Sequence, residues 1–321
     1  KDFSVLFRDC TINTDDSAVG NGAFNISSSL PDVGHIVLEN LKVNGPAAPV
    51  SVKATAGSAP ALDNLSGTIL HNGQSYDLPG FIAAYEAHRR QLAALKDATV
   101  DVNTLAPAPG TGRVSVSGKF PLRGTGSFLQ YCEAGDKFEL EVRPFPLGRA
   151  RKKQLLLVTD PQGKIIRKLE PDSDGKAHRI EFTAEQTGVY RVQYDTRRAM
   201  LFIKSAMPGQ GLSSNGELCM VRPSGRLYFE VPAGVREFSL VLSGDPGELL
   251  SAVLRGPDGK AVFSGRDFDE KTIFTGTRSD ASAPEIWSID FIRAEEDVAL
   301  RFCEPLAPVG AGSPEALLRR K

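Results

Sequence analysis

Apolar and polar residues alternate along short stretches of residues 1–70, which is the pattern of β-strands with one buried face. Polar turn sequences at 13–16 and 43–46 separate these stretches. The alternating apolar positions are Phe3, Val5 and Phe7, then Ile36 and Leu38, then Leu41 and Val43, then Val50 and Val52. The pattern predicts a strand-rich N-terminal segment.

One phrase of this pattern occurs twice near the start of the chain. Residues 7–12 (Phe-Arg-Asp-Cys-Thr-Ile) and 38–43 (Leu-Glu-Asn-Leu-Lys-Val) both read apolar, charged, Asp or Asn, apolar, polar, apolar, at an offset of 31 residues. A weaker third copy follows at 62–67. A short strand that recurs at this period indicates a solenoid, in which each coil buries its apolar face against the next. We therefore expect terminal coils of a parallel β-helix over residues 1–78.

The spacing of apolar residues becomes helical over residues 80–95. Pro79 stands where a helix can begin. The positions at helical spacing are Phe81, Ile82, Tyr85, Leu92 and Leu95. The open end of a solenoid exposes apolar core and strand edges, so we expect this helix to cover it. The helical spacing and the Pro/Gly-rich stretch 105–112 together predict a helical cap and linker at 79–112.

The rest of the chain reads as two copies of one domain. A Pro-x-Gly-Lys hairpin sequence at 161–164 recurs at 257–260, an offset of 96 residues. Three further segments pair in the same order: 134–140 with 233–240, 180–182 with 289–291, and 189–192 with 298–301. Short alternating strands between turns, in copies of about 100 residues, predict antiparallel β-sandwiches. The expected fold is thus all-β, with the first sandwich at 113–208 and the second at 209–321.

Composition narrows the classes of protein. The net charge of −1 and the isoelectric point of about 6.5 argue against a nucleic-acid partner, whose binders are usually basic. No apolar run approaches the length of about 18–20 residues that a membrane span needs. The chain opens on a strand-like run without a Met, so we expect Lys1 to be a cut or processed end.

The four cysteines form no Cys-x-x-Cys pair, which argues against a zinc or redox motif. Two interpretations stay open. All four thiols of Cys10, Cys132, Cys219 and Cys303 are buried in strands, or one bridge joins Cys219 to Cys303 across the last domain.

Two short sequences carry carboxylates that bear on catalysis or metal binding. Asp15 and Asp16 are the catalytic candidates, because paired carboxylates can protonate a leaving group and activate water; a solvated Asx-turn is the alternative.

Residues 172–175 (Asp-Ser-Asp-Gly) open like a calcium loop, but Thr183 stands at its twelfth position, which excludes an EF-hand. We expect no cofactor, with calcium held by a sandwich loop as the alternative. His35, His71, His88 and His178 form no ligand motif.

The candidate binding residues are a basic run and the lone tryptophan. If Arg167 and Lys168 lie on a strand next to the run, the cations form one patch that suits a sulfated or uronic-acid glycan; a solvated loop is the alternative. Trp287 either stacks on a sugar or lies in the core. The run consists of Arg149, Arg151, Lys152 and Lys153.

The repeated N-terminal phrase resembles the coils of right-handed parallel β-helix proteins of the pectin-lyase-like group. Residues 115–205, with Gly188-Val189-Tyr190, resemble a bacterial pre-peptidase C-terminal type sandwich. Residues 215–306 match less well, since Asp297-Val298-Ala299 stands at the position paired with that tripeptide. The Gly-His-Gly sequence of polygalacturonase-type hydrolases is missing, and no Arg-x-Lys sequence accompanies Asp15 and Asp16 within residues 1–78.

The resemblance implies a secreted, periplasmic or cell-surface bacterial protein that acts on carbohydrate, a glycoside hydrolase or polysaccharide lyase. This chain would be its C-terminal accessory region, which caps the solenoid and binds polysaccharide, with catalytic coils upstream or on a second chain. One alternative is a complete enzyme that uses Asp15 and Asp16. Another is an adhesion or surface-structural protein.

Overall fold

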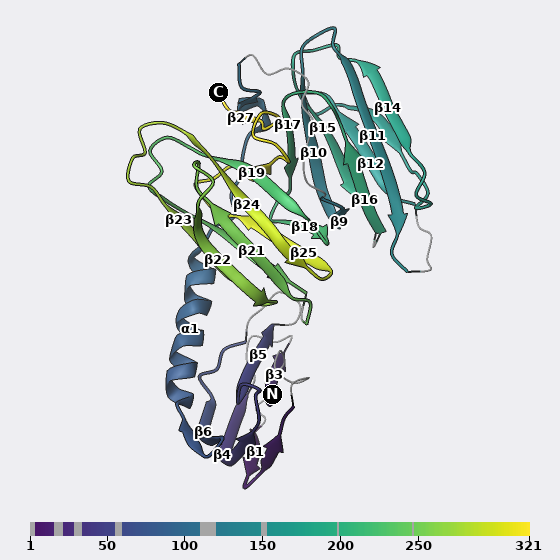
Figure 1. Cartoon of the computed structure of the whole chain (residues 1–321). Coiled ribbons are helices and arrows are strands. Elements are labelled where there is room, and N and C mark those ends of the chain that lie inside the picture. The colour runs from purple at the N-terminus through teal and green to yellow at the C-terminus, as the bar shows by residue number, and fades with distance from the viewer. Residues whose placement is uncertain are drawn as a thin grey trace. The chain divides into compact units, whose positions relative to one another are not determined.

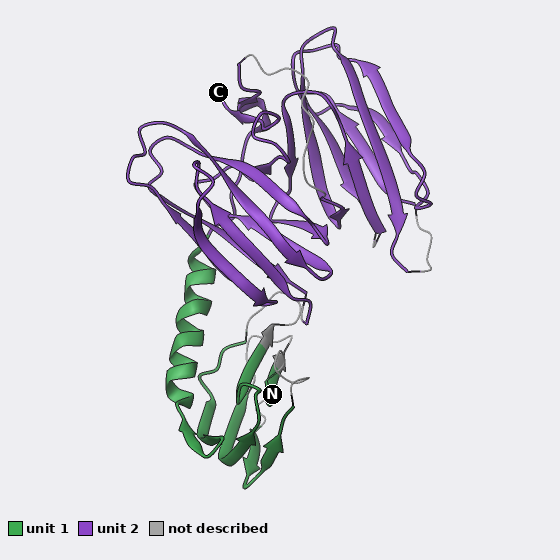
Figure 2. Ribbon diagram, viewed as in Figure 1, with its two compact units in different colours: residues 1–95 green, residues 96–321 purple. Residues whose placement is uncertain are grey.

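The computed structural model describes residues 4–15, 22–28, 34–54, 60–109, 120–148, 153–197, 199–245 and 247–321. The chain divides into two compact units, residues 1–95 and 96–321 (Figure 2). Strands dominate both, and α1 (Leu78–Ala94) is the α-helix of the described part (Figure 1). The prediction of a mostly β chain is confirmed.

The first unit stacks its strands in parallel. β1 (Ser4–Arg8) and β2 (Thr11–Asn13) pair with β4 (His35–Asn44), which pairs with β6 (Leu65–His71); β3 (Phe24–Ser28) pairs with β5 (Val50–Ala54). An antiparallel strand, β7 (Gln74–Tyr76), ends the sheet beyond β6. The repeated phrase stacks on itself, since Phe7 lies opposite Leu38 and Ile12 opposite Val43. The first two copies of the predicted repeat are thus real structural equivalents.

The third copy of the phrase, proposed at 62–67, is out of register and that alignment is wrong. Leu65 lies opposite Ile36, not opposite Leu41. The register then shifts between Leu38 and Leu41. Gly67 makes this possible, because it has φ 131° and a Cβ there would lie 1.9 Å from the Leu38 carbonyl oxygen.

Two hydrogen bonds between side chains join β4 to the neighbouring coil of β1 and β2, and we call them the polar ladder. Asn40 Nδ2 donates to Asp9 Oδ1 at 3.0 Å, and Asn44 Nδ2 donates to Asn13 Oδ1 at 2.9 Å. Asp9 and Asn40 have φ of 54° and 56°, in the left-handed region that Asp and Asn tolerate better than most residues. The Asp/Asn position of the repeat is therefore set by backbone conformation as well as by hydrogen bonding.

Helix α1 covers the apolar interior of the first unit. Its N-terminus is capped by Asp77, whose carboxylate accepts the Gly80 N–H at 2.9 Å. Phe81, Ile82 and Tyr85 pack against the buried cluster formed by the coils. Glu86 accepts the Leu62 N–H at 2.9 Å, which ties the helix to the last coil. The helix predicted near 80–95 is confirmed.

The second unit contains the same sandwich twice (Figure 1). We call residues 122–204 the first sandwich and 217–302 the second sandwich. The strands of the first are β9 (Leu122–Arg123), β10 (Thr125–Cys132), β11 (Lys137–Pro146), β12 (Leu155–Thr159), β13 (Ile165–Leu169), β14 (His178–Thr183), β15 (Gly188–Asp195) and β16 (Ala199–Lys204). Those of the second are β18 (Glu217–Val221), β19 (Gly225–Val231), β20 (Glu237–Gly244), β21 (Leu250–Arg255), β22 (Ala261–Phe268), β23 (Thr272–Thr277), β24 (Glu285–Ala294) and β25 (Asp297–Phe302).

The pairing of strands is identical in the two sandwiches. β15 lies between β10 and β12 just as β24 lies between β19 and β21, and β11 pairs with β14 and β16 just as β20 pairs with β23 and β25. The two hairpin turns also match, because the Asp160 and Gly256 N–H groups bond the carbonyls of Lys164 and Lys260, each at 3.0 Å. The predicted duplication is confirmed.

Two of the segment pairs proposed from sequence are nevertheless wrong by one strand. The structural equivalent of β14 is β23, so 180–182 does not match 289–291. The equivalent of β15 is β24, so 189–192 does not match 298–301. Apolar-polar-apolar phrases recur in almost every strand of a sandwich, so a match between short phrases does not identify the strand.

The two sandwiches share one eight-stranded sheet. The two-residue strand β9 pairs with β16 on one side and β18 on the other, with Leu122 opposite both Leu201 and Met220. The apolar residues of both sandwiches form a single buried cluster. The second unit is therefore one body rather than two domains on a flexible linker.

Segments outside the sandwiches close the second unit. β17 (Gln210–Ser213) pairs with β10 and β26 (Val309–Gly310) pairs with β17, while β27 (Arg319–Arg320) pairs with β8 (Leu105–Ala106). The short 3₁₀-helix η2 (Val102–Thr104) precedes β8. Residues near both ends of this unit thus pack together.

The four cysteines are free thiols. Cys219 lies opposite Ala299 in the β18–β25 pair. Cys303 is four residues after Ala299 in the chain. Four extended residues span about 13 Å, well beyond the Cα separation of about 7 Å that a disulfide allows. The proposed Cys219–Cys303 bridge is therefore wrong. Burial raises the pKa of Cys132 to about 12.

Candidate functional site

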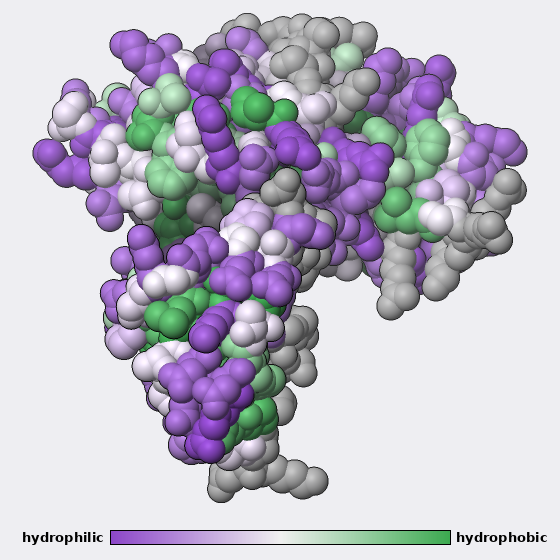
Figure 3. Space-filling model, turned by 60° about the horizontal axis from the view of Figure 1, so that its bottom comes forward, coloured by the Kyte–Doolittle hydropathy of each residue, from purple (hydrophilic) through white to green (hydrophobic). Residues whose placement is uncertain are grey.

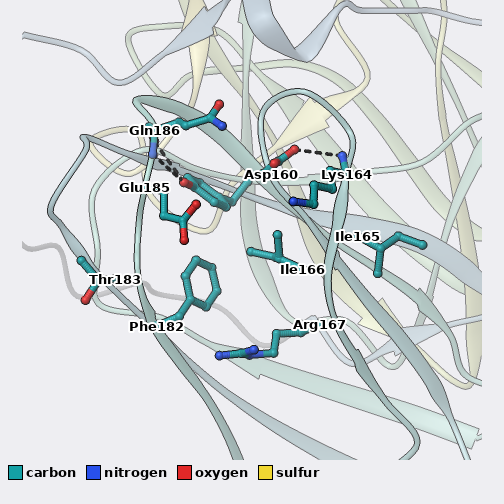
Figure 4. Close-up of a pocket in the computed structure, with 10 residues that line it drawn as sticks. Asp160, Lys164, Ile165, Ile166, Arg167, Phe182, Thr183, Glu185 and Gln186 are labelled. Atoms are coloured by element: carbon teal, nitrogen blue, oxygen red, sulfur yellow. Dashed lines mark hydrogen bonds between the residues drawn. The ribbon is translucent and has the colours of Figure 1, made fainter.

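A pocket of about 310 Å³ opens along one side of the first sandwich (Figure 4). It lies between β13 and β14, which are the edge strands of the two packed sheets. The turn after β12 and the loop between β14 and β15 complete it. An opening between two sheet edges exposes side chains that a closed sandwich would bury.

The floor of the pocket is aromatic and rigid. Tyr190 is 1% exposed, and its hydroxyl both accepts from the Gln186 N–H and donates to the Gln186 carbonyl at 3.1 Å. The ring of Phe182 lies 5.4 Å from that of Tyr190 and stacks at 4.5 Å on Phe138. Burial raises the pKa of Tyr190. The floor is thus held from below and presents an apolar surface.

The rim of the pocket carries charges of both signs. Lys164, Arg167 and Glu185 are exposed, and their charged groups make no hydrogen bond or ion pair within the described part of the chain. Figure 4 shows Glu185 and Phe182 facing Ile166 across the pocket. Many other surface charges of this chain are paired, as Lys168 is with Glu170 at 2.9 Å. The rim therefore offers an acceptor and two cationic donors to a ligand.

Asp160 differs from these rim residues, because it has a structural role. Its Oδ1 accepts the N–H groups of Gln162 and Lys164 at 3.0 and 2.9 Å, which is the hydrogen bonding of an Asx-turn. This turn fixes the hairpin that carries Lys164 toward the pocket. Glu185 is thus the carboxylate of the pocket that is available to a ligand.

The second sandwich supplies an internal comparison for this pocket. Thr159 lies opposite Ile165 and Arg191, while Arg255 lies opposite Ala261 and Ser288. Asp160 and Gly256 are matched by their turns, and Asp136 and Arg236 are matched by the bonds that their carbonyls accept from Ala184 and Arg278. The strand registers then equate three positions. Arg167 corresponds to Phe263, Phe182 to Gly276, and Tyr190 to Trp287.

These positions close the second sandwich where the first is open. The half-buried Phe263 ring packs edge-on at 4.7 Å against Phe274, which belongs to the buried cluster. The Phe238 ring reaches to 2.3 Å from where a Cβ of Gly276 would be, so that ring fills the space. The first sandwich thus has a cation, Arg167, where its copy has an aromatic ring packed against the core. The pocket is a departure from the shared fold, and such departures are typical of functional sites.

The structure brings together some of the candidate binding residues and separates others. Arg167 lies on β13, which pairs with β12 as expected, and it lines the pocket. Lys153 is exposed, and its backbone pairs with that of Asp172 in an isolated antiparallel β-bridge, outside the residues that line the pocket. Trp287 is 3% exposed, with its Nε1 donating to Glu285 and its ring against Phe238 at 4.9 Å, so its faces lie in the core. Arg149, Arg151 and Lys152 lie outside the described residues.

Asp15 is not among the residues that line the pocket. Asp15 is exposed and follows β2 in the first unit, whereas the pocket is in the second. Asp16 lies outside the described residues. Glu185 and Tyr190 were missed as site residues. Gly188-Val189-Tyr190 drew attention to the strand, but nothing in the sequence indicates that the preceding loop opens a pocket.

The loop proposed for calcium is organised by the chain itself. Asp174 accepts the Lys176 N–H at 3.0 Å and pairs with the Lys176 ammonium at 3.2 Å. The first of these bonds is the main reason that the pKa of Asp174 is lowered. Ser173 is buried. The residues of this loop are therefore not arranged as a free set of ligands.

A different group of carboxylates has the spacing of metal ligands. Oxygens of Asp245, Glu248 and Asp297 lie within 4.8 Å of one another. Arg123 pairs with Asp297, and Glu248 accepts the Asp297 N–H at 2.8 Å, so protein groups already engage part of the cluster. Burial, then Asp245, raises the pKa of Glu248. Among the described residues this is the group that could hold a cation.

Within the described residues, no helix has the length and apolar character needed to cross a membrane.

Comparisons with known proteins give no family for this chain. No protein-family model matches it, and no curated protein matches it. An isomalto-dextranase of Arthrobacter globiformis T6, solved with panose, is 10% identical with a TM-score of 0.20; the match covers 87% of this chain and 59% of that one. The chain therefore spans less than two thirds of that enzyme.

Two further solved structures are similar at the same low level. A candidate secreted protein from Parabacteroides distasonis ATCC 8503 is 9% identical, with a TM-score of 0.15 over 65% of this chain and 96% of that one. A chain of the T13 IBDV viral particle is 9% identical, with a TM-score of 0.14 over 70% and 74%. TM-scores this low assign neither a fold nor a function to this chain.

Proposed function

We propose that this chain is an accessory region that binds polysaccharide through the pocket of the first sandwich. The observation that carries the proposal is the pairing of an aromatic floor, Phe182 on Tyr190, with unpaired polar groups at the rim. A sugar ring has an apolar C–H face and hydroxyls that both donate and accept. Glu185 accepts, whereas Lys164 and Arg167 donate. The pocket thus matches both sides of a sugar.

The same residues favour binding over hydrolysis. A glycoside hydrolase uses a pair of carboxylates on opposite sides of the scissile bond. Glu185 is available, but Asp160 is held by two backbone N–H groups in its turn. The complete-enzyme alternative on Asp15 and Asp16 has no support from the pocket, which lies in the other unit. A polysaccharide partner would fit a secreted, periplasmic or cell-surface location.

Copying the second sandwich into the first tests this proposal. Arg167→Phe places the ring of Phe263 at the equivalent position, and we expect it to fill the pocket and weaken oligosaccharide binding at least tenfold, about 1.4 kcal/mol. Isothermal titration calorimetry with a panel of neutral oligosaccharides measures the effect.

The matched control is Arg179→Phe, an exposed arginine on β14 that does not line the pocket. It should bind as the unaltered chain does, and both variants should keep the melting temperature within a few degrees. Undiminished binding by Arg167→Phe, or no binding of any oligosaccharide by the unaltered chain, would show that the pocket is not a glycan site.

We also propose that the first unit is the end of a longer parallel β-helix. The support is the parallel stacking of the described coils, and the repeated phrase and polar ladder that join β1 and β2 to β4. On the far side of β1 from β4 the sheet has no further strand among the described residues, and Leu6 there is 50% exposed. A strand edge of this kind is a template for another strand. In this arrangement the terminal coils are residues 1–78, and the cap with its linker is 79–112. The two sandwiches are 113–208 and 209–321.

Intact mass of material from the natural source, measured under denaturing and native conditions, tests the β-helix proposal. A longer polypeptide, or a second chain that co-purifies, is the expected result, since either supplies the preceding coils. A mass of 34.5 kDa in both states would contradict it.

A further inference from the structure

A second hollow lies on the outer face of the first sandwich, away from the pocket described above. We call it the outer groove. Its volume is about 280 Å³, and it is lined by strands β10, β15 and β17, with Thr99, Val100, Val102, Ser214, Asn215 and Pro308 beside them. This volume suits one sugar-sized group.

A row of polar side chains crosses the floor of the outer groove. Gln193 on β15 lies opposite Ser127 on β10, which lies opposite Ser213 on β17. Residues that face each other across adjacent strands project from the same side of a sheet. Three neighbouring strands thus present an amide and two hydroxyls in one line. If this face of the sheet served only to pack against other segments, apolar side chains would be expected here, like that of the adjacent Leu129.

Arg191 adds one positive charge to this row. It is two residues from Gln193 on β15, so the two side chains share the outer face. Its guanidinium makes no hydrogen bond or ion pair within the described part of the chain. None of the described residues that line the groove is acidic. The cation therefore has no neutralising partner in the groove.

One buried hydroxyl of a lining residue also lacks a hydrogen bond. Ser214 is 7% exposed, and its hydroxyl has no partner among the described residues. A buried hydroxyl without a partner costs free energy, so native proteins nearly always satisfy it with protein, water or ligand. The groove thus combines an unpaired cation with a buried hydroxyl that needs a partner.

We infer that the outer groove binds an acidic sugar residue, with its carboxylate or sulfate on Arg191 and its hydroxyls on the row of Gln193, Ser127 and Ser213. A guanidinium binds either oxyanion through paired N–H donors. The polar row supplies the donors and acceptors that ring hydroxyls require. The outer groove and the pocket share no lining residue, so this inference does not rest on the proposed function.

Small ligands separate the outer groove from the pocket. Calorimetry on the full chain uses three probes: a glucuronic-acid disaccharide, a sulfated disaccharide and a neutral disaccharide. We expect one or both acidic probes to bind at least tenfold more tightly than the neutral one, and Arg191→Gln to remove that advantage. The matched control Arg179→Gln should keep it, as should Arg167→Phe, which alters only the pocket.

The two acidic probes tell carboxylate from sulfate as the bound group. Ser127→Leu, which fills the groove without changing charge, should also abolish the preference for acidic ligands, and it serves if Arg191→Gln fails to fold. Equal affinity for acidic and neutral probes, or an acidic preference that survives both variants, would overturn the inference. Loss of the acidic preference in Arg167→Phe instead would assign the anion to the pocket and overturn it as well.

Discussion

Replacing Arg278 with methionine is expected to lower the free energy of unfolding of the second unit by about 3–5 kcal/mol. The Arg278 side chain is 2% exposed and pairs with Glu285 at 3.5 Å. Its Nε and both Nη nitrogens donate to backbone carbonyls in the loop between β23 and β24 and at the end of β19. These acceptors belong to Val231, Pro232, Asp280 and Ala283. Methionine fills much of the volume but leaves these carbonyls without their donors.

Urea unfolding followed by tryptophan fluorescence measures this loss, because Trp287 is the single tryptophan and lies in the same sandwich. Arg236→Met is the matched control. Arg236 is exposed and donates to Ser279 O at 3.3 Å, so its loss should cost about 0.5 kcal/mol or less. Equal effects of the two substitutions would mean that the buried arginine does not hold the loop.

Leu122→Ala is expected to cost about 2–5 kcal/mol and to destabilise both sandwiches together. Leu122 is fully buried on β9, the strand that joins the sheet of one sandwich to that of the other. Removing its side chain leaves a cavity at the joint, where Leu201 and Met220 lie opposite it. The loss should therefore appear on either side of β9.

Two measurements follow the two sandwiches in this variant. Trp287 fluorescence reports on the second sandwich, and hydrogen exchange of the β10 amides reports on the first. Ile292→Ala, at a side chain that is 60% exposed, is the control and should change stability by less than about 0.5 kcal/mol. A variant that loses protection in one sandwich alone would show that the sheet does not couple them.

Local signals in the sequence predicted much of the architecture. The Asp9 and Asn40 positions could be identified because a left-handed residue and a polar ladder both select Asp or Asn. The Pro-x-Gly-Lys turns were identifiable because the hairpin needs Pro and Gly at fixed places. These features are decided by residues close together in the chain.

Features that depend on distant pairing were not predicted. The alignment of β14 with β24 was wrong because the short apolar-polar patterns of different strands look alike. Only the backbone pairing of the strands shows that β14 corresponds to β23. The bridge from Cys219 to Cys303 was wrong for the same reason. The sharing of one sheet through two residues, Leu122 and Arg123, leaves no mark in a sequence pattern.

The pocket shows a similar limit. Arg167 was among the basic residues singled out, but its meaning depends on the comparison with Phe263, which needs the correct strand register. Glu185 sits in a loop whose sequence is ordinary for a polar turn. Cations near a hairpin can be predicted from sequence, whereas the space between two sheet edges cannot.

The way the second unit is closed also bears on how it can be made. β27 pairs with β8, so Arg319 must find Ala106 across more than 200 residues of intervening chain. Contacts between residues so far apart slow folding, because the chain loses entropy before they form. A polypeptide that emerges N-terminus first can form each sandwich as it appears, but it cannot complete the unit until β27 has emerged. Slow completion would leave the β8 edge open to other chains, so the pairing of β27 with β8 is a late step that protects this edge.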